Sequence, residues 1–262
     1  MSANDTLVRF TVEGRILRAT LSLPGRRNAL SDAMLEQLVS GVRRHQAAQD
    51  IRALMLDGDG GSFCAGRDLS DQADDFEQGP AQLVVTHRRF ADLMVEFAEL
   101  PVVKIAVIEG YAVGAGWSLA AACDLRYAAS DAVFSIPELS LGYPFGMGGV
   151  ARLVRHLGLA RAAELVLSGR RFGAEEALGH GFLSNVGPLE DHRAEAVRMA
   201  DVIASRPALV LAQTARELRD AARSLVAAAD RDVEGIVLAS LDEECRQTTI
   251  QYATRFSRKQ AS

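Results

Sequence analysis

The chain has 262 residues, 48% of them hydrophobic and 24% charged, which is the composition of an ordinary water-soluble globular protein with a sizeable buried core. Its net charge of −5 and its aromatic content of 6% argue against a nucleic-acid-binding or membrane-binding surface. No apolar run approaches the ~20 residues that span a bilayer, and the N-terminus lacks the layout of a signal peptide, so we expect a cytoplasmic protein.

The cysteines are few and scattered. Cys64, Cys123 and Cys245 lie far apart in the sequence, and an odd, scattered set is typical of reduced thiols. No CxxC or HExxH spacing occurs. We therefore expect neither a metal site nor a resident cofactor.

The beginning of the chain predicts the order strand, strand, helix, strand. Residues 8–23 alternate between apolar and polar on either side of Glu13-Gly14, which predicts a β-hairpin. Ser31 is suited to cap the start of a helix that ends around Arg43-Arg44. The apolar face of this helix consists of Met34, Leu35, Leu38 and Val42. Residues 51–56 are apolar enough for a central strand.

A glycine turn, a polar stretch and a second helix follow. Residues 62–69 read as a strand end that turns at Gly66, and the acidic residues 70–80 predict a mobile loop or a lid. Residues 82–100 have the apolar spacing of a helix. Within this helix we expect His87, Arg88 and Arg89 on the solvated face.

Residues 105–149 carry the features that predict a site. An apolar strand reaches Gly110, and the turn Gly114-Ala115-Gly116 leads directly into a buried, alanine-rich helix over residues 117–123. The first N–H groups of that helix lie at the positive end of its dipole, which suits an oxygen that gains negative charge in a reaction. Glu138 ends a second apolar segment, where burial raises the pKa of a carboxyl toward neutrality. These donors and this carboxyl predict a site that moves a proton next to a carbonyl.

The remainder of the chain predicts helices. Short helices are expected over residues 150–156, 159–168 and 172–178, and long ones over residues 191–205, 208–228 and 230–252. No strand signal appears beyond residue 189. We expect a core over residues 1–188 and an all-helical region over residues 189–262 that packs on this core or on a neighbouring subunit.

Taken together, these segments resemble the enoyl-CoA hydratase/isomerase family, also called the crotonase superfamily. The resemblance covers residues 8–256 and rests on the order and spacing of its pieces. The pieces are Pro24…Arg27-Asn28-Ala29-Leu30, Phe63-Cys64-Ala65-Gly66-Arg67-Asp68-Leu69, Gly110-Tyr111-Ala112-Val113-Gly114-Ala115-Gly116, Cys123-Asp124-Leu125, Phe134…Pro137-Glu138…Leu141-Gly142…Gly146…Gly148-Gly149 and Gly169…Ala174…Glu176-Ala177.

The resemblance implies an α/β fold in which strand-strand-helix turns wind into a spiral, followed by a C-terminal helical region for trimerisation. It also implies a homotrimer or a dimer of trimers. The implied substrate is an acyl-CoA thioester, with coenzyme A present only as part of it. In the family two backbone N–H groups hold the thioester oxygen, and motif for motif they fall on Arg67 and Ala115.

The expected substrate contacts surround these two residues. The guanidinium groups of Arg26, Arg27 and Arg67 are expected either to reach a CoA phosphate or to be solvated surface charge. Large side chains either line the acyl pocket or belong to the core, namely Trp117, Tyr143 and Phe145. The rest of the expected binding set is Ala65, Gly66, Asp68, Leu69 and Gly114.

The carboxylates decide which reaction is implied. Hydratases of the family use two glutamates, of which the second matches Glu138 and the first matches Ser118, so the machinery for hydration is incomplete. A single glutamate resembles the mitochondrial type of Δ3,Δ2-enoyl-CoA isomerase, and we expect double-bond isomerisation with Glu138 as the acid and base. A hydratase or hydratase-lyase that uses Ser118 and Glu138, and a non-catalytic acyl-CoA-binding relative, remain alternatives.

Overall fold

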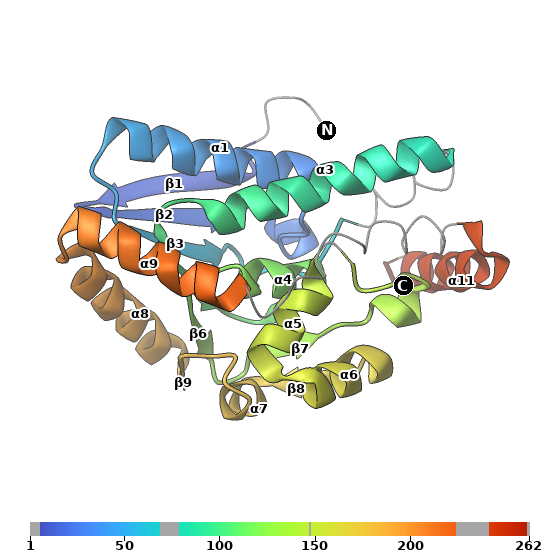
Figure 1. Cartoon of the computed structure of the whole chain (residues 1–262). Coiled ribbons are helices and arrows are strands. Elements are labelled where there is room, and N and C mark those ends of the chain that lie inside the picture. The colour runs from blue at the N-terminus through green and yellow to red at the C-terminus, as the bar shows by residue number, and fades with distance from the viewer. Residues whose placement is uncertain (1–5, 69–78, 147, 224–240, 261–262) are drawn as a thin grey trace.

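The computed structural model describes residues 6–68, 79–146, 148–223 and 241–260 (Figure 1). Most of the loop expected over residues 70–80 lies outside these ranges, and so does Leu69. None of the helices in the described ranges combines the length and the hydropathy that a membrane span requires.

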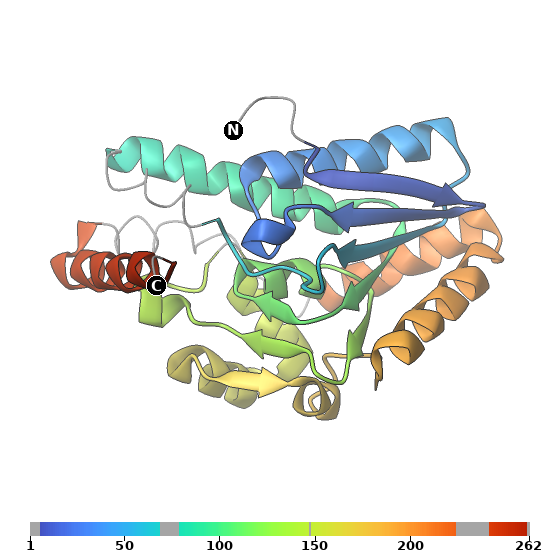
Figure 2. The same cartoon turned by 180° about the vertical axis from the view of Figure 1, so that it is seen from behind.

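A six-stranded sheet runs through the molecule (Figures 1 and 2). In spatial order its strands are β1 (Val8–Glu13), β2 (Ile16–Leu21), β3 (Ala53–Gly58), β4 (Val103–Ile108), β6 (Leu125–Ala129) and β9 (Asn185–Gly187). β1 and β2 form the expected hairpin, in which Glu13 faces Ile16 across the turn. The following pairs are parallel, and every residue of β4 is buried, as expected for a strand covered on both faces.

Helices cover both faces of this sheet. Alternate residues of β3 point to opposite sides, so Leu54 and Leu56 pack in the core that includes α1 (Asp32–Ala48) and α3 (Pro80–Glu99). Ala53 and Met55 pack instead with the alanines of α8 (Leu189–Ala204). In Figure 1, α1 and α3 lie along one side of the sheet and α8 along the other, and α9 (Ala208–Arg223) follows α8 in the chain.

The first helix begins where the sequence predicts and ends later. The Ser31 hydroxyl accepts a hydrogen bond from the Met34 amide at 3.2 Å, which is the expected cap. The four apolar side chains predicted for its buried face are all buried. The expected end at Arg43-Arg44 is wrong: the helix runs to Ala48, because the residues that follow are compatible with a helix and none is a breaker.

A second sheet of three short strands carries the site. It consists of β5 (Tyr111–Val113), β7 (Val133–Ser135) and β8 (Arg171–Gly173). β5 pairs in parallel with β7, so the turn after β5 lies beside the turn after β7. The amide of Gly114 donates to the Ser135 carbonyl at 3.0 Å, which brings the Gly114 turn toward the segment that contains Glu138. The sequence missed β8 and β9 as strands, because three residues are too few to display an alternation.

The C-terminal part is helical wherever it is described. α8 packs on the sheet through Ala196, Ala200 and Ala204, whose small side chains bring the helix backbone close to the strands. α11 (Glu243–Gln260) lies against the 3-10 helix η3 (Glu138–Leu141), where the Thr249 hydroxyl donates to the Leu141 carbonyl at 2.5 Å. The expected helices over residues 208–228 and 230–252 fall partly outside the described residues, and the division at residue 188 stays a prediction.

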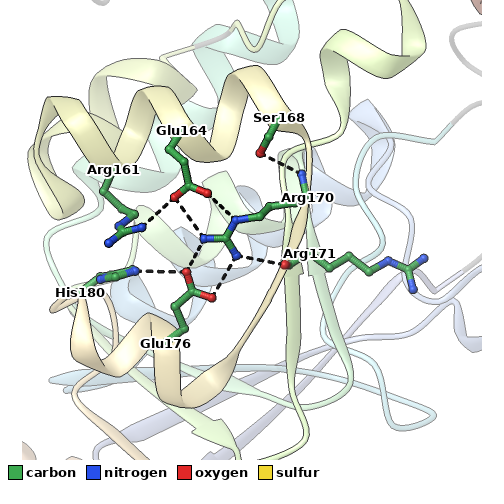
Figure 3. Close-up of polar contacts among 7 residues, drawn as sticks. All are labelled: Arg161, Glu164, Ser168, Arg170, Arg171, Glu176 and His180. Atoms are coloured by element: carbon green, nitrogen blue, oxygen red, sulfur yellow. Dashed lines mark hydrogen bonds and ion pairs between the residues drawn. The ribbon is translucent and has the colours of Figure 1, made fainter.

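An ion network joins α6 (Leu159–Ser168) to α7 (Ala174–Gly179), as Figure 3 shows. The Arg170 guanidinium lies between the carboxylates of Glu164 and Glu176 and donates to both. Arg161 adds a second donor to Glu164 at 2.8 Å. Together these contacts hold the two short helices on either side of β8, the edge strand of the second sheet.

Candidate active site

Two glycine turns lie side by side at the centre of the site. The first is Ala65-Gly66-Arg67 and the second is Gly114-Ala115-Gly116. The strand ends that lead into them are hydrogen bonded, since the Cys64 amide donates to the Tyr111 carbonyl at 2.8 Å and the Val113 amide donates to the Cys64 carbonyl at 3.1 Å. A Cβ on Gly66 would lie only 2.9 Å from the Val113 carbonyl oxygen, so the absence of a side chain is what permits the close approach.

Both turns present backbone amides without acceptors. Ala115 is the first residue of α4 (Ala115–Ala121), where the amide has no partner within the helix. Among the described residues, neither the Arg67 amide nor the Ala115 amide donates a hydrogen bond. Both residues line the same cavity. The arrangement provides donors for an oxygen that gains negative charge.

The carboxyl of Glu138 lies against the second turn. A Cβ on Gly114 would be 2.2 Å from Glu138 Oε1, so the carboxyl occupies the space that a side chain would fill there. Oε2 is buried and accepts no hydrogen bond from the residues that the structure describes. Burial raises the pKa of this carboxyl to about 7, with a smaller opposing effect of a backbone hydrogen bond. A group with this pKa both accepts and donates a proton near neutrality.

The cavity gathers six of the residues expected at the site. They are Arg67, Ala115, Ser118, Glu138, Tyr143 and Phe145. Ser118 is buried in the first turn of α4, and its hydroxyl makes no hydrogen bond within the described part of the chain. Glu138 is the one carboxylate among the lining residues that the structure describes. The described residues also contain no group of three or more side chains that could hold a metal ion.

Trp117 lies in the core and does not line this cavity. Its side chain is 0% exposed, and the ring stacks on Phe182 with 4.7 Å between ring centroids. The Phe145 ring meets the Trp117 ring edge-on at 6.3 Å. Trp117 therefore supports a wall of the cavity from behind.

Two of the expected CoA-binding residues, Arg26 and Arg27, are exposed and lie beside the first turn, where the Ala65 amide donates to the Arg27 carbonyl at 3.0 Å. The exposed Arg26 guanidinium donates to the buried Asp68 carboxylate at 2.8 Å. The Arg27 guanidinium lies over the Tyr111 ring, 5.0 Å from its centroid. Both arginines are exposed to solvent, and a guanidinium is a good donor to anionic groups such as a phosphate.

The Arg67 side chain points inward, unlike those of its two neighbours. It is 5% exposed and its guanidinium lies 4.2 Å from the centroid of the Phe90 ring. Asp32 Oδ1 is 3.2 Å from Nη1, but the pair lacks hydrogen-bond geometry. This guanidinium is not solvated surface charge.

His87 is the site residue that sequence reasoning placed wrongly. The sequence predicted a solvated position, but the side chain is 1% exposed and lines the cavity with Phe90 and Met94. The signal was present, because Leu83, His87, Phe90, Met94 and Phe97 follow the spacing of one helix face. The residue type misled the interpretation: histidine was grouped with the two arginines after it, which are indeed exposed.

Comparison with known proteins gives consistent matches. The family model described as "Enoyl-CoA hydratase/isomerase" matches residues 11–257. The chain is 35% identical over 203 residues to a probable mitochondrial enoyl-CoA hydratase of Dictyostelium discoideum, covering 76% of this chain and 70% of the relative. It is 34% identical over 205 residues to the 2,3-dehydroadipyl-CoA hydratase of Escherichia coli (strain K12), covering 78% of each.

Solved structures with similar folds include two bacterial examples. An enoyl-CoA hydratase from Bacillus anthracis superposes with a TM-score of 0.77 at 27% identity, covering 98% of this chain and 95% of that one. An enoyl-CoA hydratase from Bacillus halodurans gives a TM-score of 0.85 at 24% identity over 94% of this chain and shares the fold. The α/β fold expected from the sequence motifs is confirmed by these matches.

Proposed function

Because this chain belongs to the enoyl-CoA hydratase/isomerase family, we propose that it is an enzyme whose substrate is an acyl-CoA thioester. The observation that carries the proposal is the carboxyl of Glu138, the one carboxyl among the described cavity-lining residues, whose burial raises its pKa to about 7. It shares the cavity with Arg67 and Ala115, whose amides have no acceptor among the described residues. The amides of Arg67 and Ala115 hold the thioester oxygen, and Glu138 transfers the proton.

The proposed reaction is isomerisation of an enoyl-CoA double bond. The Glu138 carboxylate removes a proton from C2 of a 3-enoyl-CoA, and the electron pair of that C–H bond moves onto the thioester oxygen. The two amides stabilise the resulting dienolate, each by roughly 3 kcal/mol in the transition state. Glu138 then returns the proton to C4, and the double bond lies between C2 and C3. No atom is gained or lost.

The test is turnover of a 3-enoyl-CoA by the wild type and by Glu138→Gln, which keeps the shape of the side chain and removes its charge. We expect the substitution to lower kcat/KM by at least about a thousandfold, because no other carboxylate lines the described cavity. Glu176→Gln, a substitution in the remote ion network, serves as the matched control. Full activity of Glu138→Gln is incompatible with the proposal.

Hydration of a 2-enoyl-CoA is the second candidate function. Two observations favour it. Relatives are named as hydratases. Ser118 lines the cavity, and its hydroxyl makes no hydrogen bond to the residues that the structure describes. In this reaction Ser118 positions a water and Glu138 supplies the acid and base. Ser118→Ala should then abolish addition of water while leaving isomerisation measurable. A hydratase-lyase uses the same two residues and would additionally release a cleaved product.

The third alternative is an acyl-CoA-binding protein without turnover. The raised pKa of Glu138 speaks for a catalytic role, since a purely structural carboxyl needs no such environment. Tight binding of CoA thioesters with no isomerised, hydrated or cleaved product would establish binding as the only function.

For the quaternary structure we propose a homotrimer or a dimer of trimers, formed through the C-terminal helices. Support comes from α9, where Leu209, Val210 and Leu218 are exposed large apolar side chains. Analytical ultracentrifugation of the wild type should give the mass of three or six chains. A monomer at micromolar concentration is the contrary result.

A further inference from the structure

Arg67 presents a buried cation with unused hydrogen-bond donors at the wall of the cavity. Its Nε and Nη1 atoms are inaccessible to solvent and donate no hydrogen bond to any described residue. Burying donors without acceptors costs free energy, because each loses its bond to water. Because both atoms are closed to solvent, a ligand contributes acceptors to this guanidinium when the side chain turns toward the cavity that Arg67 lines.

The surroundings of the guanidinium narrow the chemistry of such a ligand. Phe90 covers one face of the guanidinium plane, and Met94, Pro144 and Phe145 complete an apolar wall. An acyl chain that fits this cavity is therefore mostly apolar. The N–H groups of Arg67 require one oxygen acceptor on that acyl chain.

Asp32 does not exhaust the capacity of Arg67. A guanidinium has five N–H donors, and Arg170 in this same chain donates to two carboxylates at once (Figure 3). Asp32 lies beside Nη1 without hydrogen-bond geometry, so it offsets the charge without occupying the donors. A second carboxylate fits the same chemistry.

We propose that Arg67 selects acyl-CoA thioesters whose acyl chain ends in a carboxylate. This inference rests on the proposed function insofar as the acyl chain occupies the cavity of Glu138. The Arg67 amide and side chain then act on different parts of one substrate. The amide holds the thioester oxygen, and the guanidinium binds the far end of the acyl group.

The other anion in such a substrate is the phosphate of coenzyme A. The inward direction of Arg67 argues against it, because the side chain is 5% exposed and lies over a cavity-lining ring, whereas Arg26 and Arg27 are on the surface. Free CoA carries the phosphates and no acyl carboxylate, so its affinity shows whether Arg67 binds a phosphate or the carboxylate.

The test is calorimetric binding of adipyl-CoA and hexanoyl-CoA, which have equal acyl length and differ by a terminal carboxylate. Neither is an enoyl thioester, so binding is measured without turnover. We expect the wild type to bind adipyl-CoA about tenfold or more tightly, the range of a hydrogen bond to a charged group. In Arg67→Met the preference should fall below about twofold, with affinity for free CoA unchanged. Arg88→Met, which removes an exposed charge from α3, should keep the wild-type preference.

Equal or tighter binding of hexanoyl-CoA by the wild type overturns the inference, and this result does not depend on the folding of any variant. Survival of the preference in Arg67→Met, or loss of affinity for free CoA, also overturns it, the latter by assigning the guanidinium to a phosphate. A different result would contradict the proposed function alone. In that result the wild type prefers adipyl-CoA over hexanoyl-CoA, but Glu138→Gln turns over 3-enoyl-CoA and 2-enoyl-CoA no more slowly than the wild type, or neither protein turns them over.

Discussion

At the scale of single residues, the environment decides what a carboxyl does. Burial raises the pKa of Glu138 to about 7, whereas hydrogen bonds from Arg170 and Arg161 lower the pKa of Glu164 to about 2. The first carboxyl exchanges protons at neutral pH, and the second stays charged and structural. The sequence predicts the role of Glu138, because its apolar neighbours and its proline are visible in the chain. The spacing of the helix face also indicates that His87 is buried, but the two arginines after it led the prediction to the solvated face.

The pKa of Glu138 predicts the pH dependence of activity. Proton removal from C2 requires the carboxylate, so kcat/KM for a 3-enoyl-CoA should rise about tenfold per pH unit up to about 7 and then level off. The measurement is a pH profile between pH 5 and pH 9. A profile that is flat below pH 7 would show that a different group, or an unperturbed carboxyl, acts as the base.

The same pKa predicts a pH-dependent cost in stability. The ordinary value is 4.5 and the folded value is about 7, so between them the folded state holds a proton that the unfolded state has released. Wild-type stability should therefore fall as pH rises through this window, by on the order of 2–3 kcal/mol from this group. Glu138→Gln lacks the effect. In urea unfolding, the stability of the variant relative to wild type should be higher at pH 8 than at pH 4.5, and an unchanged difference would contradict the burial of this carboxyl.

At the scale of elements, the site is built from two turns in which only glycine fits, because a Cβ would overlap neighbouring atoms. Gly66 and Gly114 have φ values of +104° and +51°, and an added Cβ would meet the Val113 carbonyl at one turn and the Glu138 carboxyl at the other. The sequence predicts these two turns from their glycines. It misses the short strands β8 and β9, because pairing partners and not local pattern make them strands.

Gly114→Ala should inactivate the enzyme by displacing Glu138 and straining the backbone. The added Cβ would lie 2.2 Å from Oε1, so the carboxyl must move away from the amides. We expect a loss in kcat/KM of at least about a hundredfold, since a 1 Å misplacement costs this much. Gly179→Ala is the matched control, because a Cβ there meets nothing within 4 Å. Comparable losses in the two variants would count against the placement of Glu138.

The ion network around Arg170 should affect folding and leave catalysis alone. Arg170→Met removes the donors that join Glu164 on α6 to Glu176 on α7. We expect a lower thermal midpoint, with the difference shrinking at high salt because these groups are partly exposed and screened. At temperatures where the variant is folded, kcat/KM should match the wild type. An altered KM would instead tie the network to the site.

At the scale of the whole molecule, two layers of structure meet at the cavity. β4 is a central strand of the six-stranded sheet, and the three-stranded sheet contains β5 and β7, whose ends lead to the site. α3 lines one side of the cavity with His87, Phe90 and Met94. α11 lies against η3, the element that begins with Glu138, so this C-terminal helix contacts the segment that bears the proposed acid and base. The sequence predicts the opening order of strand, strand, helix and strand and the helices of the C-terminal part, but not the strands β8 and β9. It does not predict which helix faces which segment, because that depends on contacts between residues far apart in the chain.

The most direct measurement of the central claim is hydrogen exchange at C2 of a saturated acyl-CoA in D₂O, followed by proton NMR. This reaction needs only the two amides, which stabilise the enolate, and a base at the right place, so it is independent of whether the enzyme isomerises or hydrates. The wild type should replace the C2 hydrogens with deuterium, and Glu138→Gln should not. Exchange at the wild-type rate in Glu138→Gln, or absence of exchange in a wild type that still turns over an enoyl-CoA, would contradict the account.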